Sequence, residues 1–109
     1  MSILDKEKVD GLSFDNDREE IRLLITDHLD WTDEYHHLLA LQEKINAYII
    51  FFENHQYKQV YKDITVKYAI IEIHFKYEVT KKALFFLKQV QQQLNKIGMT
   101  IECHISEEK

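Results

Sequence analysis

The sequence predicts one α+β domain, a two-layer sandwich in ββαβαβ order with a four-stranded, mostly antiparallel sheet and two helices on one face. Apolar residues alternate over four short segments, as in half-buried strands, and recur every three or four residues over two longer ones, as in amphipathic helices. The 109 residues include no proline and only two glycines, which favours regular elements joined by short turns. The strand order does not follow from these patterns.

The first two strands are predicted as a hairpin at the start of the chain. Residues 9–14 form the first strand, and the polar residues 15–18 form a turn. Residues 20–26 form the second strand, in which Ile21, Leu23 and Ile25 alternate on the core side.

The first helix is predicted to begin after an N-cap at Asp30 or Thr32 and to continue to about Tyr57. Its apolar residues form one stripe at spacings of three and four. The members of this stripe are Leu38, Leu41, Ile45, Tyr48, Ile49 and Phe52.

The remaining elements are a strand, a helix and a strand. Residues 66–77 alternate as the third strand, and Thr80 is a suitable N-cap for the second helix. Gly98 is expected to end this helix in a left-handed conformation. Residues 99–105 then alternate as the last strand, which places Cys103 on the core side as a buried structural cysteine.

Composition and charge restrict the classes of function. The chain carries a formal charge of −5, of which residues 1–40 contribute 11 acids and 4 bases. Because no cluster of lysine and arginine is present, we expect no nucleic-acid binding, whereas the acidic first third could attract a basic protein. A single cysteine, no signal peptide and no long apolar run predict a cytoplasmic protein that does not span a membrane. Residues 1–109 form the domain, with loose termini at 1–8 and 106–109.

The most unusual segment lies between the second strand and the first helix. It joins carboxylates, histidines and the only tryptophan, and its expected role is to bind a partner protein. Helix capping by Asp30 and Asp33, with Trp31 packed at the helix start, explains the same residues. A metal-dependent or acid–base site made of Asp27, His28, Asp30 and His37 is the alternative. The candidate partner-binding residues are Asp27, His28, Asp30, Trp31, Asp33, Glu34 and His37.

The outer face of the sheet is a second candidate surface. His74 and His104 can meet across neighbouring strands there, as a solvated pair or, less simply, as a metal site. The residues expected to project from this face are Arg22, Leu24, Tyr68, Ile70, Glu72, His74, Lys76, Glu102 and His104.

Two short motifs in the sequence resemble those of a family of short bacterial proteins of unknown function. They are Asp27-His28-Leu29-Asp30-Trp31, which reads DHLDW, and residues 41–48, which read LQEKINAY and fit the pattern LQEKxNxY. The resemblance implies a bacterial cytoplasmic domain and carries no activity with it.

Together these observations predict a non-enzymatic protein-binding module, most concretely an immunity-type inhibitor of a basic bacterial toxin. No glycine-rich phosphate loop or zinc motif is present, so we expect no cofactor and no bound metal. A structural homodimer of unknown role is a further alternative.

Overall fold

A computed structural model describes residues 3–4 and 9–106 of the chain. Its elements are β1 (Gly11–Asp15), β2 (Glu20–Asp27), α1 (Glu34–Glu53), the 3-10 helix η1 (Gln56–Gln59), β3 (Tyr68–Phe75), α2 (Lys81–Leu94), the 3-10 helix η2 (Asn95–Ile97) and β4 (Met99–Ile105). The predicted α+β class with four strands and two α-helices is confirmed. The two short 3-10 helices were not expected.

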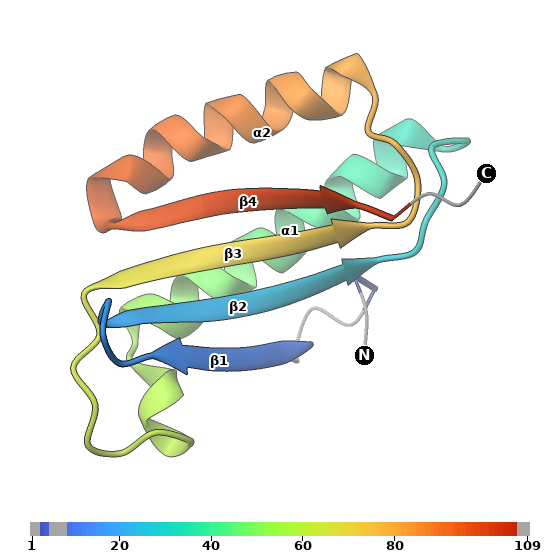
Figure 1. The fold of residues 1–109 in the computed structure, drawn as a ribbon. Coiled ribbons are helices and arrows are strands. Elements are labelled where there is room, and N and C mark those ends of the chain that lie inside the picture. Colours follow the sequence, from blue (N-terminus) through green and yellow to red (C-terminus); the bar gives the residue numbers. More distant parts are fainter. Residues whose placement is uncertain (1–2, 5–8, 107–109) are drawn as a thin grey trace.

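The four strands form one mixed sheet in the order β1-β2-β3-β4 (Figure 1). β1 pairs antiparallel with β2, whereas the pairs β2–β3 and β3–β4 are parallel. The prediction of a mostly antiparallel sheet is therefore wrong. The reason is that each α-helix carries the chain back along the sheet, so the next strand starts at the same end as the previous one. The 20 residues of α1 span about 30 Å and the eight of β2 about 26 Å, so one helix completes this return.

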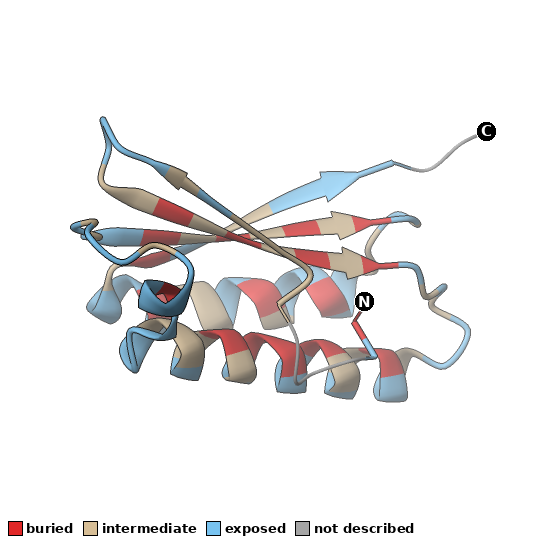
Figure 2. Cartoon of the chain, turned by 90° about the horizontal axis from the view of Figure 1, so that it is seen from below, coloured by how far each residue is buried: buried red, intermediate tan, exposed pale blue. Residues whose placement is uncertain are grey.

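Both helices lie on one face of the sheet, and the core lies between the two layers (Figure 2). Two successive right-handed crossovers that advance in the same direction across a sheet place their helices on the same side. Alternate strand residues point into this core, as the periodicity predicts. The buried strand residues are Ile21, Leu23, Ile25, Ala69, Ile71, Ile73, Phe75 and Met99. Among the described residues, no helix lies over the opposite face of the sheet (Figure 2).

Helix α1 differs from its prediction at both ends. Asp33 caps it by accepting a hydrogen bond from the backbone amide of His36. The capping interpretation of the junction included Asp33, whereas the helix prediction placed the N-cap at Asp30 or Thr32. The helix ends at Glu53 because His55 adopts a left-handed conformation with φ of 56°, and Tyr57 lies in η1. Its buried side also includes His37 and Lys44, two polar residues that the apolar stripe did not contain.

The predicted cap of α2 is confirmed. Thr80 Oγ1 accepts a hydrogen bond of 3.1 Å from the backbone amide of Ala83. Gly98 is left-handed, with φ of 73°, and it ends η2 and so leads the chain into β4. Cys103, in contrast, is exposed, so the prediction of a buried cysteine is wrong. The reason is that β4 lies at the edge of the sheet and has a neighbouring strand, β3, on one side only.

The Thr80→Ala variant is expected to unfold with a free energy about 1 kcal/mol lower than that of the wild type, because one amide of the first helical turn loses its acceptor. Urea unfolding followed by circular dichroism measures the difference. Thr65→Ala, at an exposed loop position, is the matched control and should change stability by less than about 0.5 kcal/mol. Equal stability of the two variants would show that this cap contributes nothing.

The termini were predicted to be loose at 1–8 and 106–109, and most of these residues lie outside the described part of the chain. Among those described, Ile3 is buried in the core and its backbone amide donates to the carbonyl of Thr26 at 2.9 Å. Ser106 continues the pairing of β4, since its amide donates to the carbonyl of Phe75 at 2.9 Å.

Candidate functional site

The segment between β2 and α1 is a series of turns, each of which is closed by an aspartate. Asp27 Oδ1 accepts from the amide of Leu29 at 3.1 Å, and Asp30 Oδ1 accepts from that of Thr32 at 3.0 Å. Asp33 Oδ1 accepts from the amide of His36 at 3.3 Å and so caps α1. Aspartate side chains commonly close such local turns. The spacing of three residues between the aspartates therefore has a structural cause.

Asp27 and His37 form a buried pair that joins the end of β2 to the first turn of α1. Asp27 Oδ2 and His37 Nε2 are 2.5 Å apart, and both side chains are almost fully enclosed. His37 Nδ1 lies 2.9 Å from the carbonyl oxygen of Asp30. A carbonyl oxygen only accepts, so Nδ1 carries a proton, and a second proton lies between Nε2 and the carboxyl group of Asp27. Both ring nitrogens are thus committed to contacts inside the protein.

Burial raises the pKa of Asp27, and the hydrogen bond from His37 opposes this shift. The carboxyl group shares the proton with His37 in a site that water does not reach. A group that acts as a general base must also reach its substrate, and both side chains of this pair are almost fully enclosed. The contact of this pair joins β2 to α1 and so holds the junction in shape.

Trp31 covers this pair. Its ring stacks on the imidazole of His37 with centroids 3.6 Å apart and an angle of 18° between the planes, and it also contacts Phe75. The indole Nε1 is buried without a hydrogen-bond acceptor among the described residues. Trp31 is half-buried, so its main contribution is to pack the start of α1. This is the packing role that the capping interpretation assigns to it.

The candidate partner-binding residues thus divide into two groups. Asp27 and His37 lie in the interior, whereas His28, Asp30 and Asp33 are exposed and Glu34 is half-buried. The structure brings together only part of the proposed metal or acid–base set. Asp27 contacts His37, but Asp30 contacts His37 through its backbone carbonyl and its carboxylate binds Thr32. Among the described residues, a group of three ligating side chains that could hold a metal ion lies elsewhere, on the outer face of the sheet.

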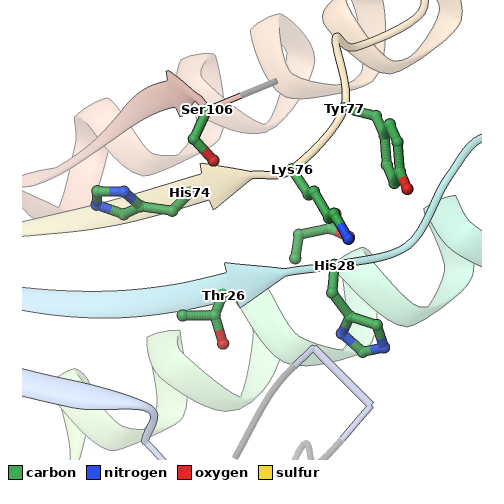
Figure 3. A pocket seen from close by; sticks show the side chains of 7 residues that line it. Thr26, His28, His74, Lys76, Tyr77 and Ser106 are labelled. Atoms are coloured by element: carbon green, nitrogen blue, oxygen red, sulfur yellow. The ribbon is translucent and has the colours of Figure 1, made fainter. Parts of the chain in front are cut away.

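A cavity of about 560 Å³ lies next to the junction, where the parallel strands end (Figure 3). In open α/β sheets, ligands commonly bind outside the carboxyl ends of parallel strands. The sequence interpretation assigned Asp27 and His28 to the junction, and His74 and Lys76 to the outer face of the sheet. It did not bring the two pairs together, because the parallel pairing that places these strand ends side by side was not predicted. The cavity is lined by Thr26, Asp27, His28, His74, Lys76, Tyr77 and Ser106.

The outer face of the sheet carries a network of charged side chains. Arg22 Nη1 lies 3.4 Å from Glu72 Oε2 and 3.2 Å from Glu102 Oε1. The prediction that His74 and His104 can meet across strands is confirmed, since they are register partners whose rings stack at 4.7 Å. The hydrogen bond from His104 and, to a smaller extent, the one from Arg22 lower the pKa of Glu102.

The fold and the junction define a small α+β domain with an uncovered sheet face and an exposed acidic loop. The chain belongs to a family of unknown function, described as "Family of unknown function (DUF6572)", whose model matches residues 1–107. Neither a curated protein nor a solved structure matches the chain. None of the helices in the described residues has the length and apolar character that crossing a bilayer needs.

Proposed function

We propose that this protein is a non-enzymatic protein-binding module, and most concretely an immunity-type inhibitor of a basic bacterial toxin. The observation that carries the proposal is the fixed negative charge of the exposed loop before α1. Asp30 and Asp33 are both exposed, and the backbone hydrogen bonds from Thr32 and His36 lower their respective pKa values. Two carboxylates that are held in place by the backbone form a preorganised contact for a cationic partner.

Apolar side chains lie beside these carboxylates. Leu4 and Tyr35 are 64% and 68% exposed. Leu4 lines a hollow of about 260 Å³ together with Asp30 and Asp33, and Tyr35 follows on the first turn of α1. We call Leu4, Asp30, Asp33 and Tyr35 the acidic edge. Aromatic and aliphatic anchors next to charged groups are typical of protein interfaces, in which the anchors supply affinity and the charges supply orientation and association rate.

The interior of the junction supports a binding role over a catalytic one. His37 has both nitrogens occupied, and Asp27 is enclosed. The same contacts give the acidic edge a rigid base, because they tie the loop to both β2 and α1. A rigid loop loses less conformational entropy on binding than a mobile one.

The test is to measure the binding of any basic toxin encoded beside the gene to the wild type and to the Asp30→Asn, Asp33→Asn double variant. Asparagine keeps the turn and cap hydrogen bonds and removes only the charge. We expect at least about 10-fold weaker binding, mainly through slower association, and a weaker dependence on salt. Surface plasmon resonance at two salt concentrations measures both effects.

The matched control is the Asp17→Asn, Asp63→Asn variant, which removes the same charge from exposed positions outside the acidic edge. It should bind as the wild type does. If the two variants lost the same affinity, net charge and not the acidic edge would explain the binding. Absence of binding by the wild type would contradict the immunity role, and light scattering would then test the alternative of a structural homodimer.

A further inference from the structure

The outer face of the sheet contains the same three-residue pattern twice. Glu72 and His74 are two residues apart on β3, and Glu102 and His104 are two residues apart on β4. Residues separated by two in a strand point to the same face. The two strands are parallel and in register, so Glu72 faces Glu102 and His74 faces His104. The four side chains therefore form a square of two carboxylates and two imidazoles.

Three of these side chains converge on a small volume. Glu72 Oε1 lies 2.8 Å from His74 Nε2 and 3.7 Å from His104 Nε2. One ligand atom from each of Glu72, His74 and His104 lies within 4.8 Å of the others. Four ligands around zinc at about 2.0–2.1 Å are separated by about 3.4 Å, so movements of about 1 Å complete the geometry. Both imidazoles are partly exposed, which leaves their rings room to make these movements.

The neighbouring charges suit a cation with these three ligands. Arg22 contacts Glu20, Glu72 and Glu102, and it reaches Glu72 through Oε2. Glu72 Oε1 is the oxygen on the side of the histidines. Glu102 accepts from His104 Nε2 at 2.7 Å, and a metal ion would take the place of that proton. The single positive charge of Arg22 thus offsets one of these three carboxylates, and the remaining negative charge can neutralise a bound ion.

We propose that Glu72, His74 and His104 bind a divalent transition-metal ion, for which zinc is the best chemical match. Two imidazoles and one carboxylate form a ligand set that zinc commonly uses with a water molecule in its fourth position. His74 also lines the cavity of about 560 Å³ at the strand ends (Figure 3), so an exogenous ligand could approach the ion from there. Without a metal, the same residues form a solvated network of hydrogen bonds. The proposal does not depend on the proposed protein partner.

The experiment is a titration of the full, tag-free, metal-stripped chain with zinc chloride by isothermal titration calorimetry. We expect one zinc ion per chain. His74→Asn and His104→Asn should each weaken binding by at least about 10-fold, since even loss of an outer-shell contact to a ligand costs about 10–100-fold. Glu102→Gln, which alters only a neighbour of His104, should have a smaller effect. Cobalt(II) in place of zinc should give a visible absorption band that the two histidine variants lose.

His36→Asn is the matched control. His36 is exposed and paired with a carboxylate, with 2.8 Å between its Nδ1 and Asp33 Oδ2, but among the described residues it does not belong to the group of three ligating side chains that could hold a metal ion. This variant should bind zinc as the wild type does. Circular dichroism checks that each variant is folded. The proposal is overturned if the wild type gives no binding heat, if the His74→Asn, His104→Asn double variant binds with unchanged affinity, or if His36→Asn loses as much affinity as they do.

Discussion

The Asp27→Ala variant is expected to unfold with a free energy about 3–5 kcal/mol lower than that of the wild type. The substitution leaves His37 Nε2 buried without its partner and removes the acceptor for the amide of Leu29. A domain of this size has a total stability of about 5–15 kcal/mol, so the loss is a large share of it. Urea unfolding monitored by Trp31 fluorescence measures the effect, since Trp31 stacks on His37.

Asp27→Asn is the matched control for this pair. Its amide oxygen can accept from Leu29 and its amide group can donate to His37 Nε2, so both hydrogen bonds are kept. We expect it to lose less than half as much stability as Asp27→Ala. A loss below about 1 kcal/mol in Asp27→Ala would show that the pair does not hold the junction together.

The wild type and the Asp27→Asn variant also differ in how stability depends on pH. Burial raises the pKa of Asp27, so the folded chain retains a proton that the unfolded carboxyl group releases above its ordinary pKa of about 3.9. The stability contributed by Asp27 therefore falls as the pH rises from that value to the folded pKa. An asparagine side chain does not titrate, so this part of the pH dependence should be absent from Asp27→Asn.

The Lys44→Met variant is also expected to unfold with a free energy about 3–5 kcal/mol lower than that of the wild type. The side chains of Lys44 and Asp10 are almost completely buried, and Nζ lies 2.9 Å from Asp10 Oδ1. Methionine fills most of the same volume but leaves the Asp10 carboxylate in the interior without its cation. Asp10 also accepts from the amide of Thr26 at 3.0 Å, and its own amide donates to the hydroxyl of Tyr48 at 2.8 Å. The network thus joins the start of the chain, β2 and α1.

A double-mutant cycle separates this interaction from simple packing. Asp10→Asn combined with Lys44→Met removes both charges, and we expect it to be more stable than the sum of the single losses predicts, by about 0.5–3 kcal/mol. Lys67→Met is the control, because Lys67 pairs with Glu19 on the surface, with 3.3 Å between the charged atoms. This variant should lose less than about 1 kcal/mol of its free energy of unfolding. Strict additivity in the cycle would contradict a coupled buried pair.

Local patterns were sufficient for the elements and their caps. The alternation of Ile21, Leu23 and Ile25 marks a strand with one buried face, and the structure buries all three. Thr80 and Gly98 act at the positions that their chemistry favours. These features depend on residues close together in the chain, where backbone conformation and side-chain hydrogen bonding are local.

The candidate sites could be predicted from the sequence only in part. Asp27, Asp30 and Asp33 could be identified as a motif, but their division between interior and surface depends on where α1 packs. His37 and Lys44 interrupt the apolar stripe of α1, and a charged residue is seldom buried unless it is paired. Their partners, Asp27 and Asp10, lie 10 and 34 residues away. A pattern within one helix contains no information on such partners.

The α+β class, the half-buried strands, the two amphipathic helices and the acidic character of the loop before α1 all follow from local sequence patterns. The parallel direction of β2, β3 and β4, which assembles the cavity at their ends, appears only in the folded chain. The same holds for the register that places Glu72 and His74 of β3 beside Glu102 and His104 of β4, although the whole of α2 separates them in the chain. The physical reason is that strand direction and register depend on packing between distant segments, whereas periodicity, capping and charge depend on neighbouring residues.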